Sequence, residues 1–203
     1  MKMGPVSGVI LAGGASRRMG RDKALLAWRG RPLIETLAGR LRLVADEIII
    51  VASHVERYAV FADRCVPDVF PGVGALGGIH AGLHAAAHEW AFIVACDMPF
   101  LNPAVLASFL AATDGADLVV LNAEGYLEPL HALYHKNCLP AIEAAVRSGQ
   151  RCAFSFYDQV RVRYITPSEI AHLDAGLRSF RNVNTPAEWQ MILLEEETIG
   201  EPL

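Results

Sequence analysis

The residues best suited to carry chemistry lie in a short segment rich in glycine and arginine, LAGGASRRMGRDK, which runs from Leu11 to Lys23. Paired glycines let backbone N–H groups approach phosphate oxygens closely, and arginine and lysine neutralise the remaining charge. The spacing does not fit the Walker pattern GxxxxGK[ST], because Lys23 follows Asp22 and precedes Ala24. We therefore predict a phosphate loop of another kind, with a flexible surface loop as the alternative.

A second candidate is Asp97 in the run ACDMPFL, where an apolar segment ends at an acidic residue. Mg²⁺ in nucleotide sites typically takes one or two protein carboxylates together with phosphate oxygens and water. We therefore expect Asp97 to hold a metal against a triphosphate. The alternative is that Asp97 accepts backbone hydrogen bonds in a turn before Pro99.

A third stretch, PGVGALGG from Pro71 to Gly78, contains the pattern GxGxxG. Taken as a dinucleotide fingerprint it is weak, because the preceding residues make a poor strand. A glycine loop that opens a helix at about Leu76 remains suited to binding a nucleotide. Asp68, just upstream, can accept hydrogen bonds from a base or ribose, or can simply form a turn before the proline.

The histidines give weaker indications. His80, His84 and His88 follow an i, i+4 spacing that predicts one helix face, but no HExxH pattern accompanies them. A partly solvated helix face is favoured over a zinc site. We expect His131 and His135 to face a substrate or to be structural rather than to bind metal.

Helices and strands must bring these residues together. Along the chain, apolar runs alternate with segments of helical spacing. Near-continuous apolar runs rich in β-branched residues predict buried strands, and so a mostly parallel sheet covered by helices in a three-layer α/β fold. The later third predicts a mixed sheet. Thr185-Pro186-Ala187-Glu188 predicts a capping box that starts a last helix through about Leu194. The predicted strands are 6–12, 47–52, 91–96, 116–122, 129–135 and 160–165, and the other predicted helices are 32–44, 79–90, 103–112 and 138–149.

Composition limits the class of protein. A length of 203 residues suits a single domain, and a net charge of -4 argues against a general nucleic-acid binder. No apolar run reaches membrane-spanning length, and no signal-peptide pattern precedes the first apolar run. The 4 cysteines form no CxxC pair, so we expect free thiols in a reducing cytoplasm.

At these residues the chain resembles the molybdenum cofactor guanylyltransferases, whose loop reads approximately LAGGxSxRMGxDK. The resemblance extends over nearly the whole chain and rests on several motifs in the family's order. Besides the first loop these are Asp68 with the PGxGxLGG loop, CDMP at 96–99, PLHALY at 129–134 and NVNTP at 182–186. The resemblance implies a Rossmann-like nucleotidyltransferase fold that spans residues 1–203 as one domain.

The implied reaction is transfer of GMP from GTP to the terminal phosphate of molybdopterin, with Mg²⁺ bound and pyrophosphate released. By matched position, the residues that would bind the nucleotide are Leu11, Ala12, Gly13, Gly14, Lys23, Asp68, Gly78 and Asp97, with Asp97 also the metal ligand. Asn182 and Asn184 would lie by the acceptor phosphate or the metal. Lys23 and Arg17 or Arg18 would neutralise charge during transfer. Ser53 departs from an asparagine found in some members, which puts its contact with the nucleotide in question.

Other functions remain open at this point. A cytidylyltransferase acting on the same cofactor or a sugar-phosphate nucleotidyltransferase has a similar build, although such loops tend to read LAAG. A non-catalytic nucleotide-binding module is less compatible with the presence of both Lys23 and Asp97. The resemblance also leaves open transient contacts with cofactor-delivery proteins or molybdoenzymes, and it implies neither nucleic-acid nor membrane partners.

Overall fold

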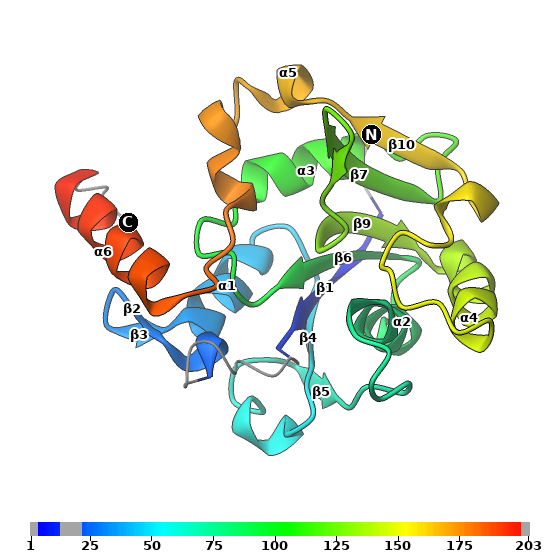
Figure 1. Ribbon diagram of the computed structural model, residues 1–203, viewed down its shortest axis with the longest axis horizontal. Coiled ribbons are helices and arrows are strands. Elements are labelled where there is room, and N and C mark those ends of the chain that lie inside the picture. The colour runs from blue at the N-terminus through cyan, green and yellow to red at the C-terminus, as the bar shows by residue number, and fades with distance from the viewer. Residues whose placement is uncertain (1–3, 13–21, 200–203) are drawn as a thin grey trace.

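A computed structural model describes residues 4–12 and 22–199, and a twisted mixed sheet forms its centre (Figure 1). The strand order is β10-β7-β9-β6-β1-β4-β5, with β8 paired to β7. All neighbours on this path are parallel except β9, which is antiparallel to both β6 and β7. The strands are β1 (Val6–Leu11), β4 (Glu47–Val51), β5 (Arg64–Val66), β6 (Trp90–Ala95), β7 (Leu118–Ala123), β8 (Tyr126–Leu127), β9 (His131–His135) and β10 (Val162–Ile165).

Helices cover both faces of the sheet and make three layers. Alternate residues of β1 and β4 point to opposite sides, so that Ile10 and Ile48 join one apolar core while Val9 and Ile49 join the other. The first core includes α1 and α3, and the second includes α2 and α4. This arrangement confirms the predicted three-layer α/β fold with a mixed, mostly parallel sheet. The helices are α1 (Leu33–Leu41), α2 (Ala75–Ala85), α3 (Pro103–Ala111), α4 (Leu139–Arg147), α5 (Pro167–Ile170) and α6 (Pro186–Ile199).

The predicted strands are confirmed to within a few residues, whereas one predicted helix is misplaced. The start of α2 at Ala75 agrees with the helix predicted to open at about Leu76, but the helical pattern predicted over residues 79–90 extends too far, because α2 ends at Ala85 and Trp90 already belongs to β6. The run of helix-favouring alanines continues to Ala87, past the last residue of α2, so composition does not mark the end of the helix. His88 consequently lies outside the helix, and the expected single face of three histidines does not form.

The C-terminal part of the chain packs against a small hairpin of β2 (Ala27–Trp28) and β3 (Arg31–Pro32). Trp28 is buried, and its ring lies 5.5 Å from that of Trp189 on α6 and 5.6 Å from that of Phe100. The expected capping box is confirmed, because Glu188 N donates to Thr185 Oγ1 and Thr185 N donates to the Glu188 carboxylate. These contacts fix the position of the segment just before α6.

Within residues 4–12 and 22–199, none of the helices combines the length and the apolar character required to cross a bilayer. The cysteines Cys65, Cys96, Cys138 and Cys152 are all free thiols, as expected.

Candidate active site

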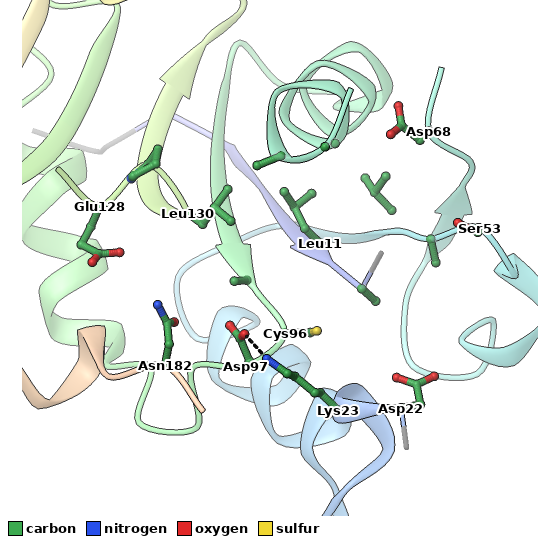
Figure 2. Close-up of a pocket in the computed structure, with 18 of the residues that line it drawn as sticks. Leu11, Asp22, Lys23, Ser53, Asp68, Cys96, Asp97, Glu128, Leu130 and Asn182 are labelled. Atoms are coloured by element: carbon green, nitrogen blue, oxygen red, sulfur yellow. Dashed lines mark hydrogen bonds and ion pairs between the residues drawn. The ribbon is translucent and has the colours of Figure 1, made fainter. Parts of the chain in front are cut away.

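The candidate site lies where the chain leaves two adjacent parallel strands. Leu11 at the end of β1 is in register with Ala95 at the end of β6, and Cys96 N donates to Leu11 O at 3.2 Å. Ligands in open α/β sheets bind outside the carboxyl ends of the strands. A cavity of about 1500 Å³ opens at this edge, and its described lining includes Leu11, Lys23 and Asp97 (Figure 2).

A lysine links two remote segments at the centre of this cavity. Lys23 Nζ lies 3.0 Å from Asp97 Oδ2 and 2.9 Å from Asn184 Oδ1. The side chains of Lys23 and Asp97 are only 15% and 19% exposed, so their attraction is less screened than that of a surface pair. The segment after β1, the turn after β6 and the segment before α6 therefore meet at one ammonium group.

The residue preceding the lysine anchors it. The Asp22 carboxylate accepts a hydrogen bond from Ala24 N at 3.1 Å and so caps the short 3-10 helix η1 (Lys23–Leu25). It also accepts a hydrogen bond from Tyr58 Oη at 2.5 Å. Burial and the neighbouring Asp22 charge raise the pKa of Tyr58, so its hydroxyl stays protonated and remains a donor. Sequence reasoning assigned no role to Asp22 or Tyr58, although the position of Asp22 beside the lysine was a usable signal.

The turn that carries Asp97 is held from two directions. Arg40 on α1 donates from Nη1 to Pro99 O at 2.6 Å and to Leu101 O at 3.3 Å. Val183 N donates to Asp97 O at 2.9 Å, which ties the turn to the segment carrying the two asparagines. The alternative role for Asp97, a side chain that accepts backbone hydrogen bonds in this turn, is not seen within the described residues, where its carboxylate contacts Lys23 instead.

The predicted nucleotide-binding residues lie around one end of the same cavity. Ala12, Ser53, Asp68 and Gly78 line it together with Leu11, and Figure 2 shows Ser53 and Asp68 on the same side of Lys23. Asp68 Oδ1 accepts a hydrogen bond from Phe70 N at 2.8 Å, which leaves its other carboxylate oxygen for a ligand. The contact predicted for Ser53 thus has a place in the cavity, although the shorter side chain is exposed there.

Close packing holds Asp68 in place. A Cβ atom on Gly77 would lie 2.8 and 2.9 Å from the two carboxylate oxygens of Asp68 and 3.0 Å from Phe70 O. Contacts this short do not occur with a real side chain, so only glycine at position 77 permits this arrangement. Gly77 lies in the first turn of α2. This glycine of the PGVGALGG stretch is therefore explained by the close approach of Asp68 to the helix backbone, and it does not require a bound dinucleotide.

The opposite end of the cavity contains groups that sequence reasoning missed. Asn182, a predicted acceptor-binding residue, lines the cavity together with Glu128, Tyr126 and Phe154. Figure 2 shows Glu128 and Asn182 on the side away from Asp68. Glu128 precedes Pro129, the first residue of a predicted strand. An acidic residue there was visible in the sequence, but nothing in its pattern indicated burial.

Some predicted residues cannot be placed. Gly13, Gly14, Arg17 and Arg18 lie outside the described residues, so their assignment to phosphate binding remains a prediction. The described ends of that segment, Ala12 and Lys23, both line the cavity.

The histidines considered in the sequence analysis do not line the cavity that contains Lys23 and Asp97. His80 is buried, stacks on His84 with ring centroids 5.7 Å apart, and lies 3.4 Å from the Glu143 carboxylate on α4. The expectation of a partly solvated face was therefore wrong for His80. His131 is fully buried against Phe180, and burial lowers its pKa to about 3. His131 is therefore structural, which was one of the two alternatives.

The oxygen groups at the centre of the cavity fit a hard divalent cation. Asp97 and Asn184 present a carboxylate oxygen and an amide oxygen to a single positive charge, the ammonium of Lys23. Among the described residues no cluster of three or more His, Cys, Asp or Glu side chains could enclose a metal ion. A metal here would complete its coordination with substrate phosphates and water, which is the usual behaviour of Mg²⁺.

Comparison with known proteins identifies the family. Residues 8–162 match the model of the MobA-like NTP transferase domain. The chain is 41% identical to a probable molybdenum cofactor guanylyltransferase of Pelotomaculum thermopropionicum, over 90% of this chain and 89% of the relative. It is 39% identical to a molybdenum cofactor guanylyltransferase of Desulfosudis oleivorans, over 92% and 93% of the two chains.

A solved structure agrees in fold. Molybdopterin-guanine dinucleotide biosynthesis protein A from Archaeoglobus fulgidus superposes with a TM-score of 0.81 at 27% identity, over 93% of this chain and 99% of the other. The likeness therefore extends over nearly the whole of both chains. The chain belongs to the molybdenum cofactor guanylyltransferase family and is a nucleotidyltransferase with a MobA-like domain.

Proposed function

We propose that the chain transfers GMP from GTP to the terminal phosphate of molybdopterin, which yields the guanine dinucleotide form of the molybdenum cofactor and pyrophosphate. The observation that carries this proposal is the Lys23 ammonium held between Asp97 and Asn184 in the middle of a two-ended cavity. Its volume of about 1500 Å³ exceeds that of a pocket for one small ligand, typically about 300–1000 Å³. The names of the relatives supply the two substrates.

The two ends suggest where each substrate binds. GTP would bind along Leu11, Ala12, Ser53, Asp68 and Gly78, with the undescribed Gly13 and Gly14 cradling its phosphates. The acceptor phosphate would enter from the side of Asn182. In this arrangement both phosphates converge on Lys23, whose positive charge offsets their mutual repulsion.

The transfer needs little covalent chemistry from the protein. An oxygen of the acceptor phosphate attacks the α-phosphorus of GTP and forms a new P–O bond. The bond from that phosphorus to the bridging oxygen of the β-phosphate breaks, and its electron pair leaves with pyrophosphate. Because the nucleophile is already anionic, no general base is required. The thiol of Cys96 is a poor nucleophile in place of the acceptor phosphate, because burial raises its pKa to about 12.

The metal would be Mg²⁺, held by Asp97 with the Asn184 amide oxygen beside it. When bound, it supplies charge neutralisation for the triphosphate and for the departing pyrophosphate. Lys23 and Arg18 would then contact phosphate oxygens, and Asp22 and Tyr58 would keep Lys23 directed at them. Arg40 and Val183 would keep the Asp97 carboxylate in position.

The proposal also includes the domain organisation, the cellular location and the partners of the chain. We expect residues 1–203 to work as one domain in the cytoplasm, a location favoured by the free cysteines. The finished cofactor would pass by transient contact to delivery proteins or molybdoenzymes. No nucleic acid or membrane partner is expected.

The test is product identification. The purified chain is incubated with Mg²⁺, molybdopterin and α-labelled GTP or CTP, and the dinucleotide formed is identified by mass. We expect label from GTP in the product and equimolar pyrophosphate. Preferential incorporation of CMP would indicate a cytidylyltransferase instead. Transfer only to a sugar phosphate offered as an alternative acceptor would indicate a sugar-phosphate nucleotidyltransferase.

A further inference from the structure

The end of the cavity away from Asp68 contains a buried carboxylate that has no partner among the described residues. Glu128 is only 8% exposed, yet its side chain lines the cavity. Its backbone is held by the fold, because Glu128 N donates to Leu121 O and Glu128 O accepts from His131 N. In the part of the chain that the structure describes, no hydrogen-bond donor or cation contacts its carboxylate. The carboxylate can be hydrated only from the cavity, so a ligand that displaces this water must supply hydrogen-bond donors in its place.

The electrostatic surroundings strengthen this expectation. Burial, together with the charge of Asp97, raises the pKa of Glu128 to about 7. The carboxylate therefore lacks the compensation that the other acidic residues near the site receive. Asp22 and Asp97, by contrast, accept hydrogen bonds from Tyr58 and Lys23.

Exposed aromatic rings also line this cavity. Tyr126, two residues earlier, is 67% exposed, and Phe154 is 48% exposed, and both line the cavity. Large aromatic side chains left open at a cavity wall offer their faces to a flat ring, and their stacking tolerates variation in the ring. The cavity therefore offers aromatic surfaces for stacking and, at Glu128, an acceptor for donors on the edge of a ring.

Resting on the proposed function, we propose that Glu128 recognises the pterin of the acceptor. Its carboxylate would accept hydrogen bonds from the ring N–H and the exocyclic amino group of the pterin, while Tyr126 and Phe154 cover the ring faces. The two donors lie side by side on the aminopyrimidinone edge and match the two oxygens of one carboxylate.

The assignment also explains how two similar rings are kept apart. Guanine and pterin present the same aminopyrimidinone edge, so a site for both needs two separate acceptors. Asp68 and Glu128 lie on opposite sides of the Lys23–Asp97 pair in Figure 2. We infer that Asp68 belongs to the guanine end and Glu128 to the pterin end.

The experiment is a binding titration that does not depend on catalysis. Unsubstituted pterin, which is fluorescent, is titrated with the wild-type chain, with Glu128→Gln and with Glu124→Gln. In Glu128→Gln the side-chain NH₂ group would face an N–H donor of the ring, and two donors cannot form a hydrogen bond. We therefore expect the affinity for pterin to fall at least about 10-fold. Glu124 is exposed in the turn between β7 and β8 and does not line the cavity, so its variant should bind like the wild type.

A second comparison tests stacking. Phe154→Leu should weaken pterin binding several-fold, whereas Tyr164→Leu should not, because Tyr164 is 40% exposed but does not line the cavity. Circular dichroism would verify that each variant is folded. In the transfer reaction, Glu128→Gln should raise the KM for molybdopterin and leave the KM for GTP unchanged.

The results that would contradict the pterin site differ from those that would contradict the proposed reaction. No saturable quenching by the wild type, or equal pterin affinity for wild type and Glu128→Gln, would overturn the proposal. Weaker GTP binding by Glu128→Gln would place the guanine there instead, and a raised Mg²⁺ requirement would make Glu128 a metal ligand. If pterin binds in a Glu128-dependent way but no GMP is transferred, the pterin site stands and the proposed reaction fails.

Discussion

Lys23 Nζ lies 3.0 Å from Asp97 Oδ2, although the two residues are 74 positions apart in the chain. The contact forms because β1 and β6 are parallel neighbours, so the segments that follow them leave the sheet at the same edge. Before substrates bind, each group compensates the other's charge. In the proposed reaction both groups would already be in place when the triphosphate binds, which would keep the reorganisation during transfer small.

The first prediction concerns Asp97. Asp97→Asn keeps the shape of the side chain but removes the charge that would hold Mg²⁺, so we expect kcat to fall about 100-fold or more. The measurement is GMP transfer over a range of Mg²⁺ concentrations, with the melting temperature as a check on folding. Asp114→Asn is the matched control, because Asp114 is exposed and does not line the cavity. Near-normal transfer by Asp97→Asn would refute the metal assignment.

The second prediction concerns Lys23. Lys23→Met retains the apolar stem and removes the ammonium, so we expect kcat/KM for GTP to fall about 100-fold. Because Lys23 and Asp97 are in contact, their effects should not multiply. The double variant should lose much less activity than the product of the two separate losses. A fully multiplicative loss would mean that the two side chains act independently and that their contact has no role in transfer.

The sequence indicated that the loop after the first strand and Asp97 lie at the same edge of the sheet, a general property of parallel strands, but it did not predict the direct contact between Lys23 and Asp97. Buried strands were recognisable as near-continuous apolar runs, and acidic or basic residues just after them had to lie at one edge. The capping box at Thr185 was equally local and was confirmed. The family resemblance added Asn184, which local patterns alone do not bring to this edge.

The missed features depend on tertiary packing. Tyr58 reaches Asp22 from a segment whose pattern shows no function. Glu128 is buried in the segment that leads into β9, whose antiparallel position between β6 and β7 the sequence does not reveal. The burial of His80 likewise depends on α4 packing across α2, which helical spacing does not reveal. The end of α2 was misplaced because the alanines that favour a helix continue to Ala87, beyond its last residue.

A third prediction concerns acid stability. Asp117 is buried just before β7, where its carboxylate accepts hydrogen bonds from Arg161 Nε and Nη2, each at 2.8 Å, and from Asn137 Nδ2 at 2.9 Å. These donors, chiefly Arg161, hold the pKa of Asp117 well below its ordinary value of 3.8. The stabilisation is therefore complete above the ordinary value and is lost as pH falls below it towards the folded-state pKa.

Asp117→Asn should accordingly lower the free energy of unfolding at pH 7 by about 1–3 kcal/mol, since a buried charged acceptor is removed. The difference from the wild type should be constant between about pH 7 and 5 and should shrink below about pH 4. Urea denaturation at several pH values measures it, with Asp114→Asn as the control. A difference that stays constant down to about pH 2.5 would show that lost packing, rather than the ionised carboxylate, causes the effect.

The last prediction connects the glycine loop with nucleotide binding. A methyl group at position 77 would lie 2.8 and 2.9 Å from the Asp68 oxygens, so Gly77→Ala must displace that carboxylate. We expect the affinity for GTP, measured by calorimetry, to fall about 10-fold, which corresponds to the loss of one charged hydrogen bond. Gly39→Ala is the control, because a methyl group there meets no atom within 4 Å and should stabilise α1 by about 0.5–1 kcal/mol.

Asp68→Asn separates the cause from general damage to α2. If displacement of the carboxylate is what weakens GTP binding, Asp68→Asn should lower the affinity by a similar factor, and the double variant should be little worse than either single one. The affinity for pterin should be unchanged in all three, because the pterin end lies across the cavity. If Gly77→Ala binds GTP normally while remaining folded, Asp68 is not part of the nucleotide site, and its role is confined to the turn it forms with Phe70.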